Sequence, residues 1–240
     1  MKPYQNQDTS KKKQIEKMFD AISLEYDKIN KLISAGNDVK WRKKIHKIAK
    51  NLKPKNILDI ATGTADIAIE LSKIKSSKII GLDISEKMLA VGREKILNKN
   101  LSQKISLISG DAENLTFETN CFDLVTIGFG VRNFQNLEKG LSESYRVLTT
   151  DGTLIILETS VPQNMLVKFF YLLFSRTIIP FIGSVFSKDK KAYTYLQKSA
   201  EEFPCGKDFA KILEHCGFNN VKILPQTLGA SSIYIAKKRH

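Results

Sequence analysis

The residues best placed to do chemistry lie just after predicted strands. Residues 56–66 read as a short apolar strand, a turn of small residues around Gly63 and the start of a helix. Where a parallel strand passes into a helix, backbone N–H groups point into a crevice, and small residues let a ligand approach them. A nucleotide-like cofactor is the usual ligand there, although an ordinary strand-to-helix turn fits the same residues.

The glycine content of this turn disfavours a dinucleotide. The dinucleotide fingerprint contains three glycines, whereas Ala65 and Ala68 follow Gly63 at the second and third positions. The turn alone does not separate a cofactor site from a structural feature. A nicotinamide-dependent oxidoreductase is the competing function that shares it.

Two further acidic residues follow the next two strands. Asp83 comes about 20 residues after the first turn, where a carboxylate can accept hydrogen bonds from ribose hydroxyls. Its competing role is a helix N-cap, but Ser85 is the better cap for the helix that follows. Asp111 follows the strand 105–109, where its carboxylate suits an adenine ring; a simple turn residue is the alternative.

The elements that must position these residues alternate from residue 57 onward. Alternating strands and helices of this length are typical of a parallel sheet covered on both faces. The carboxyl ends of its strands then meet along one edge. The last two strands, joined through Gly229, predict an antiparallel hairpin. The predicted strands are 57–60, 78–83, 105–109, 122–127, 153–158, 221–224 and 232–236, and the predicted helices are 64–74, 85–98, 136–147 and 207–216.

Helical segments precede this sheet. Residues 1–13 are polar and predict a loosely attached tail, and residues 11–34 predict a helix. Residues 38–52 predict a second helix with Asp38 as its N-cap and an apolar stripe that begins at Trp41. Its other face is almost entirely Lys and Arg, which fits either an anionic membrane surface or a solvated face.

A strongly apolar segment, 165–183, interrupts the alternation. Lys168, Arg176 and Pro180 lie within it and argue against a membrane span. The segment fits a lid or groove for an apolar substrate, and equally a core helix or a dimer face.

Bulk composition narrows the function classes. The chain has 240 residues, three cysteines without metal-ligand spacing and a formal net charge of +13. With no apolar N-terminal stretch, these features predict a cytoplasmic α/β protein with reduced thiols and no metal site. The charge fits anionic lipid, an anionic metabolite, nucleic acid or a Lys-rich composition. The Asn/Asp-Pro-Pro-aromatic motif of RNA methyltransferases is absent, so nucleic acid is not an expected partner.

Several motifs resemble the class I S-adenosylmethionine-dependent methyltransferases, and more closely the ubiquinone/menaquinone biosynthesis C-methyltransferases. The resemblance runs from residue 11 through nearly the whole chain. The chain departs from the family pattern at three places: Ile29 stands where the family usually has Met, Asp38 stands where it has His, and Thr149-Thr150-Asp151 replaces a basic-Pro-Gly turn. The motifs are Tyr26 to Asn30 with Ile33-Ser34 and Trp41, Gly128 to Asn133, Arg146 to Gly152 with Leu157 to Ser160, and Tyr193-x-Tyr195-Leu196 with Phe203-Pro204.

The resemblance implies a Rossmann-like α/β fold: a seven-stranded, mostly parallel sheet with an antiparallel C-terminal hairpin and helices on both faces. It implies an N-terminal helical region, 1–53, that caps the active site of a cofactor-binding domain, 54–240. An apolar substrate or lid insertion at 160–205 belongs to that domain. The implied cofactor is S-adenosyl-L-methionine, held by Thr64 near its methionine end, by Asp83 at the ribose, and by Asp111 with Ala112 at the adenine.

The resemblance also implies a substrate, a polyprenylated quinol. Demethylmenaquinol is the leading candidate, and a ubiquinone-pathway benzoquinol is the alternative. A ring carbon is a good nucleophile toward the sulfonium methyl only when a neighbouring hydroxyl loses its proton. The pKa of a phenol is about 10, so the site must help to remove this proton at neutral pH. Arg132 is expected to supply positive charge, Tyr26 and Tyr195 to orient the hydroxyl, and Asp111 or another carboxylate to accept the proton through water.

A polyprenyl tail places the substrate in a membrane. The enzyme is therefore expected to be cytoplasmic and to contact the inner face of the membrane peripherally. The basic helix 38–52 and the apolar segment 165–183 are the expected contact elements. A homodimer face remains the alternative for the apolar segment.

Overall fold

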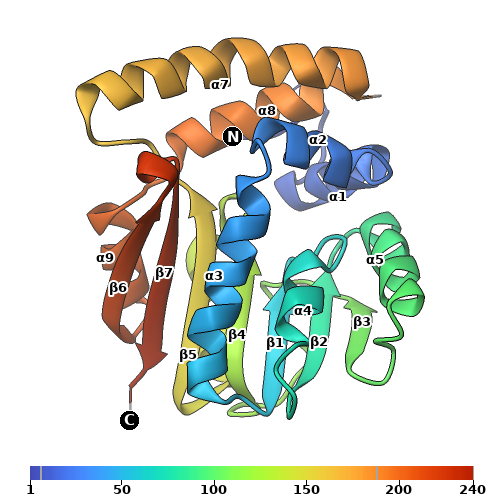
Figure 1. Ribbon diagram of the computed structural model, residues 1–240, viewed down its shortest axis with the longest axis vertical. Helices are drawn as coiled ribbons and strands as arrows, with labels where there is room; N and C mark the ends of the chain where they lie inside the picture. Colours follow the sequence, from blue (N-terminus) through green and yellow to red (C-terminus); the bar gives the residue numbers. More distant parts are fainter. Residues whose placement is uncertain (6, 188, 240) are drawn as a thin grey trace.

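A seven-stranded sheet in the order β3-β2-β1-β4-β5-β7-β6 forms the centre of the computed structural model, which describes residues 1–5, 7–187 and 189–239 (Figure 1). β1 to β5 pair in parallel, and β7 runs antiparallel between β5 and β6. The predicted seven-stranded sheet with an antiparallel C-terminal pair is confirmed. The strands are β1 Asn56–Ile60, β2 Lys78–Asp83, β3 Ile105–Ser109, β4 Phe122–Gly128, β5 Leu148–Thr159, β6 Phe218–Gln226 and β7 Ser231–Lys238.

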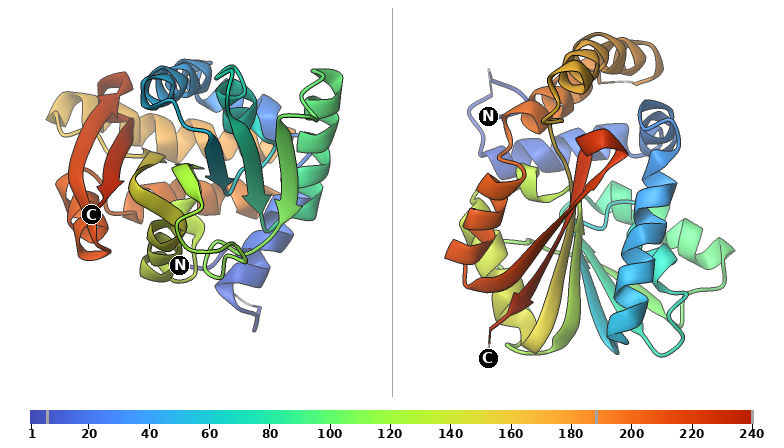
Figure 2. Two further views of the ribbon diagram at one scale, coloured as in Figure 1. Left: turned by 90° about the horizontal axis from the view of Figure 1, so that it is seen from below. Right: turned by 60° about the vertical axis from the view of Figure 1, so that its left-hand side comes forward.

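Helices cover both faces of the sheet, as predicted (Figure 2). On one face, apolar residues of α3, α4 and α5 pack against the strands, and on the other face residues of α6 and α9 do so. Each face therefore has its own hydrophobic core, which explains why the central strands are apolar on both sides. The helices are α3 Asn37–Leu52, α4 Asp66–Leu71, α5 Glu86–Asn98, α6 Leu137–Val147 and α9 Lys207–His215.

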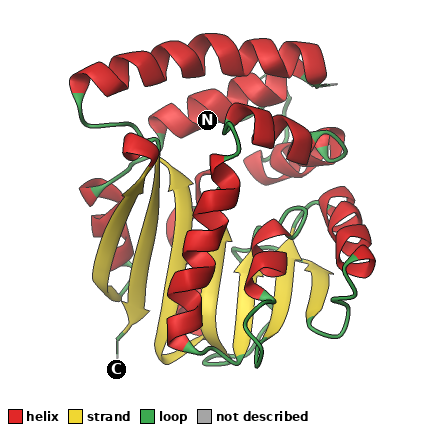
Figure 3. Ribbon diagram, viewed as in Figure 1, coloured by secondary structure: helices red, strands yellow, loops and turns green. Residues whose placement is uncertain are grey.

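The remaining four long helices lie over the carboxyl ends of the parallel strands (Figures 1 and 3). They are α1 (Lys11–Ile22), α2 (Tyr26–Ile33), α7 (Met165–Phe186) and α8 (Lys190–Glu202). A third apolar cluster joins them, in which Met18, Ile29, Ile182 and Tyr193 are buried. The sheet edge where the candidate residues converge is thus roofed by the N-terminal helices and by the two helices inserted between β5 and α9.

The N-terminal region differs from the prediction in two ways. The predicted helix 11–34 is two helices, because residues 23–25 form a turn in which the Glu25 N–H donates to the Ile22 carbonyl (3.2 Å) and the helical pattern stops. The predicted loose tail is also wrong for the part that the structure describes. Lys11 already belongs to α1, and the Tyr4 N–H donates to the Gln14 side chain (2.8 Å).

Several predicted element starts also shift by a few residues, including those of α3 and β5. Gly36, with φ 74°, precedes α3, so Asp38 lies inside the first turn and not at the N-cap. There its carboxylate accepts the Ser34 hydroxyl (2.8 Å) and pairs with Arg42 (2.8 Å). β5 begins at Leu148 and not at residue 153, because Leu148 pairs with β4 ahead of an irregularity.

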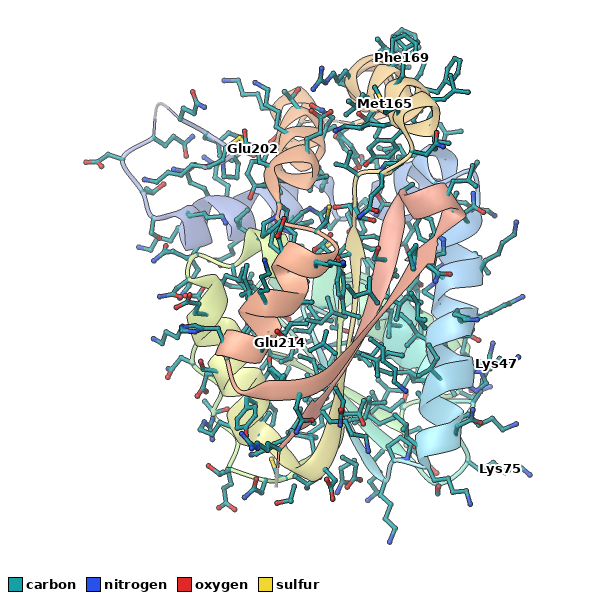
Figure 4. All side chains as sticks on the ribbon, turned by 90° about the vertical axis from the view of Figure 1, so that its left-hand side faces the viewer. Lys47, Lys75, Met165, Phe169, Glu202 and Glu214 are labelled. Carbon is teal, nitrogen blue, oxygen red and sulfur yellow. The ribbon has the colours of Figure 1, made fainter. Side chains whose placement is uncertain are left out.

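α3 and α7 have different surroundings, although both were expected to contact a membrane. α3 runs down one face of the sheet, with Trp41 and Ile45 in the core and Lys47 directed outward on the flank (Figure 4). α7 lies across the top and carries Phe169 on its outer side. By length and composition, the segment Met165–Gly183 could cross a membrane, and only 11% of that window is buried.

Candidate active site

Two adjoining cavities lie where the parallel strands end. The first, called here the α1 cavity, has a volume of about 80 Å³ and is lined by the ends of β1 to β3 and by α1. The second, the α7 cavity, has a volume of about 430 Å³ and is lined by α2, α3, α7, α8 and the ends of β1, β4 and β5. Tyr26, Ala61, Gly63, Gly128 and Phe129 line both cavities, so these residues form the boundary between them.

Asp83, the last residue of β2, connects the turn after β1 with the turn after β2 in the wall of the α1 cavity. One carboxylate oxygen accepts the N–H of Gly63 (2.8 Å), and the other accepts the N–H of Ser85 (2.9 Å). The Ser85 hydroxyl caps α5 by accepting the N–H of Met88 (3.2 Å), which confirms Ser85 as the N-cap. Burial raises the pKa of Asp83. Its oxygens keep lone pairs for a further donor, because a carboxylate can accept about four hydrogen bonds.

Asp111 and Ala112 lie in the same cavity as Asp83. One oxygen of Asp111 accepts the N–H of Glu113 (2.9 Å), as in an ordinary turn. The other pairs with the ammonium of Lys12 on α1 (2.6 Å). Asp111 is therefore a turn residue, as one of the two interpretations predicts, and its position in the cavity wall is compatible with the predicted adenine contact.

Thr64 lies in the α7 cavity, apart from the other three predicted cofactor residues. Its hydroxyl donates to Asp27 of α2 (2.6 Å). Lys95 of α5 contacts Thr64 (3.1 Å), Asp27 (2.8 Å) and Asp66. This ionic cluster ties three helices together at the cavity wall, and neither Asp27 nor Lys95 was predicted as a site residue.

Arg132 lines the α7 cavity from the short helix η1 (Val131–Asn133) that follows β4. Its Nη1 donates to the Phe129 carbonyl (2.8 Å) and to Glu158 at the end of β5 (2.5 Å). The Arg132 side chain is 8% exposed and that of Glu158 is 0% exposed. Among the described residues, Arg132 Nε and Glu158 Oε2 have no hydrogen-bond partner. Asp111 does not line the cavity that Arg132 lines; Glu158 is the carboxylate beside this guanidinium.

The predicted tyrosines occupy different positions. Tyr26 lines both cavities, and burial raises its pKa. Tyr195 lines neither cavity; its hydroxyl donates to Asn133 beside Arg132 (3.2 Å), and burial raises its pKa to about 12. Two tyrosines that were not predicted, Tyr171 of α7 and Tyr193 of α8, line the α7 cavity. The only sequence signal for Tyr171 is its polar tip within an apolar run.

Asp59 is a buried carboxylate in the wall of the α7 cavity. It accepts the hydroxyls of Thr62 (2.6 Å) and Thr126 (2.6 Å). Burial raises the pKa of Asp59 to about 6. It was not predicted as a site residue, although an acid within an apolar strand is a visible signal. Within the described residues, no group of His, Cys, Asp and Glu is arranged to hold a metal ion.

The sequence of the chain matches the ubiE/COQ5 methyltransferase family over residues 7–238. The chain belongs to this family. A demethylmenaquinone methyltransferase of Bacteroides fragilis is 42% identical over 239 residues, which are 99% of this chain and 97% of that protein. One of Chlorobaculum tepidum is 39% identical over 234 residues, which are 96% of this chain and 94% of that protein.

A solved structure shares the fold of this ubiE/COQ5 family member. It is a SAM dependent methyltransferase from Aquifex aeolicus, with a TM-score of 0.61 and 17% sequence identity. The match covers 88% of this chain and 97% of that one. The predicted Rossmann-like methyltransferase fold and the predicted family are thus confirmed.

Proposed function

We propose that this protein transfers a methyl group from S-adenosyl-L-methionine to a ring carbon of demethylmenaquinol. The observation that carries the proposal is the α7 cavity, a mostly apolar space with one buried arginine that adjoins an acid-lined cavity at the strand ends. An apolar cavity with a few polar groups suits an aromatic ring that carries hydroxyls. The names of the Bacteroides and Chlorobaculum relatives support a naphthoquinol, demethylmenaquinol, over a benzoquinol as the substrate.

The residues of the α1 cavity fit the cofactor. Asp83 offers a buried carboxylate for the ribose hydroxyls, and Asp111 with the backbone of Ala112 offers an acceptor and a donor for the adenine. Gly63, with φ 55°, lies at the boundary of the two cavities, where it has no side chain between its backbone and a ligand. Thr64 is assigned to the methionine end, because it lies beyond that boundary. S-adenosyl-L-methionine supplies a methyl group that its sulfonium activates for attack by a nucleophilic carbon.

Arg132 favours loss of the proton from the ring hydroxyl, which passes through water to a carboxylate of the cavity wall. A guanidinium stays protonated, so it donates a hydrogen bond to the ring oxygen as that oxygen loses its proton, but it does not act as the base. Because Nη1 already binds Phe129 and Glu158, the guanidinium is held in one orientation against the cavity. Tyr26 lies at the boundary of the two cavities, where it can orient the hydroxyl next to the transferred methyl. Tyr195 is assigned an indirect role, since it holds Asn133 next to Arg132.

We assign membrane contact to α7 and not to α3. α7 exposes apolar side chains on its outer side, while Tyr171, Phe174 and Ile179 line the cavity beneath it. A polyprenyl tail could thus pass from the cavity toward lipid along one helix. α3 runs down the sheet, so its basic face does not lie in the same plane as α7. The exposed apolar residues of α7 include Met165, Leu166, Phe169, Phe170, Leu173, Phe181 and Val185.

Phe169→Glu tests this contact. Burying one phenylalanine in lipid contributes about 1.5–3 kcal/mol, so the variant should bind liposomes at least about tenfold more weakly. Co-sedimentation with anionic and neutral liposomes measures it, and Leu97→Glu, another exposed apolar position, is the matched control. Unchanged liposome binding together with loss of a dimer in size-exclusion chromatography would assign the α7 face to a homodimer instead.

The catalytic proposal is tested with purified protein and methyl-labelled S-adenosyl-L-methionine. Reduced demethylmenaquinone and a benzoquinol of equal tail length are offered separately. We expect mass spectrometry to find the label on a ring carbon of the naphthoquinol, with slower transfer to the benzoquinol. Label on oxygen, or faster transfer to the benzoquinol, would contradict the proposed substrate.

A further inference from the structure

Arg132 and Glu158 form an ion pair that is almost completely removed from water. Arg132 Nη1 lies 2.5 Å from Glu158 Oε1, and the two side chains are 8% and 0% exposed. Solvent screens such charges poorly, so each acts strongly on its surroundings. Together, however, they contribute no net charge.

The position of the pair matters because it borders the α7 cavity. Arg132 lines this cavity directly, and so do Leu157 and Thr159, the neighbours of Glu158 in the chain. Glu158 is fixed in place, since its Oε1 also accepts the N–H of Thr159 (2.7 Å). Burial raises the pKa of Tyr171 in the cavity wall to about 12, and of the pair Arg132 opposes this shift while Glu158 adds to it. The opposing fields of the two charges therefore both reach the wall of the α7 cavity.

The rest of the cavity wall does not attract anions. Arg42, the other arginine that lines it, pairs with Asp38 (2.8 Å) and Asp66 (3.2 Å). Asp27 and Asp59 line the same cavity. An arginine without a counter-charge would be an anion site, because guanidinium binds carboxylates and phosphates well. Glu158 removes that property from Arg132.

We propose that Glu158 is a specificity-determining residue: by neutralising Arg132, it makes the α7 cavity accept an uncharged aromatic ring and reject the same ring bearing a carboxylate. A quinol is uncharged at neutral pH, because the pKa of its hydroxyls is about 10, whereas an aryl carboxylate is ionised. Arg132 can still hydrogen-bond a ring hydroxyl, since only its Nη1 is committed to Phe129 and Glu158. The inference rests on the proposed function in placing the ring in this cavity.

The test compares two ligands of the same shape and different charge, naphthoate and naphthamide. Their dissociation constants are measured by calorimetry on the full chain loaded with S-adenosylhomocysteine. Wild type should prefer naphthamide. Glu158→Gln keeps the size of the side chain and leaves Arg132 uncompensated, so the preference should move toward naphthoate by about tenfold or more. An unchanged ratio would overturn the inference.

The double variant Arg132→Gln with Glu158→Gln keeps the test decisive even if the single variant does not fold. Breaking a buried pair by removing one partner is costly, whereas removing both charges is tolerated. The double variant should keep the wild-type ratio, because the net charge of the pair is still zero. A tenfold relative loss of naphthoate would show that Arg132 acts uncompensated in wild type and would contradict the inference. If wild type binds no naphthamide, the proposed placement of the ring in the α7 cavity is wrong, and the proposed function is contradicted together with the inference.

Discussion

The two cavities are built in different ways from the same chain. The α1 cavity is formed mainly by strand ends and the turns directly after them, around Asp83 and Asp111. The α7 cavity takes its roof from α2, near the N-terminus, and from the consecutive helices α7 and α8, which lie much later in the sequence. The strand-end cavity thus follows from the topology of the sheet, whereas the roofed cavity depends on helices added to it. Cofactor binding and substrate choice should therefore respond to different substitutions.

The largest expected effect comes from Arg132→Gln. Loss of a preorganised hydrogen-bond donor beside the reacting ring should lower kcat by about 100-fold or more. Affinity for S-adenosyl-L-methionine should stay within about twofold, because Arg132 lines only the α7 cavity. Steady-state kinetics and calorimetry measure the two quantities, with Arg93→Gln on the surface of α5 as the control. Equal losses of kcat and of cofactor affinity would mean that a substitution in the α7 cavity also disturbs cofactor binding in the α1 cavity.

Asp83→Asn should produce the opposite pattern. Hydrogen bonds to a charged group contribute about 1.5–3 kcal/mol, so cofactor affinity should fall by roughly tenfold to a hundredfold. With saturating cofactor, turnover should recover most of its wild-type value. Calorimetry measures the affinity, and Asp208→Asn, at an exposed position of α9, is the control. Unchanged affinity would remove Asp83 from the cofactor site.

The sequence predicts the α1 cavity better than the α7 cavity for physical reasons. Asp83 and the cap at Ser85 depend on contacts within a few residues and on the parallel crossover, which local patterns reveal. Even in the α1 cavity one contact is not local, because Lys12 and Asp111 are 99 positions apart in the sequence. The pairing of Arg132 with Glu158 likewise depends on the adjacency of β4 and β5. Such contacts follow only from the packed fold.

The same limit applies to two predicted helices. An apolar stripe on residues 38–52 fits both a membrane surface and a sheet face, and only the fold places Trp41 and Ile45 in the core. The break between α1 and α2 is a short turn at residues 23–25, which periodicity does not detect. The family motifs located Arg132 and Tyr26 at the cavities, but they did not distinguish Tyr26, which lines both, from Tyr195, which lines neither.

Burial of the Asp59 carboxylate in the wall of the α7 cavity lowers the stability of the folded protein. Its pKa is about 6 in the folded protein against an ordinary value of 3.8, so the folded state binds the proton more tightly and stability falls as pH rises between these values. Asp59→Asn removes this dependence and should stabilise the protein by up to about 3 kcal/mol near neutral pH. The gain should shrink toward zero at about pH 4 in urea unfolding. A gain that is constant with pH would contradict a raised pKa.

The smallest expected effect lies at the α1 cavity. Lys12 occupies the Asp111 oxygen that an adenine amino group would approach, and both side chains are 30% exposed. Because partly exposed pairs contribute little, Lys12→Met should raise cofactor affinity by only about threefold. Lys13→Met, on the same helix, is the matched control in calorimetry. Weaker binding would show that Lys12 holds the cofactor and does not compete with it.

A crystal structure of the protein with S-adenosylhomocysteine and a naphthoquinol analogue tests most directly whether the cofactor binds in the α1 cavity and the ring in the α7 cavity. We expect adenosyl density against Asp83 and Asp111 in the α1 cavity. We expect ring density beside Arg132 beneath α7, with the sulfur at the boundary near Gly63. A ring bound outside the α7 cavity, or an adenosyl group that contacts neither Asp83 nor Asp111, would contradict this placement.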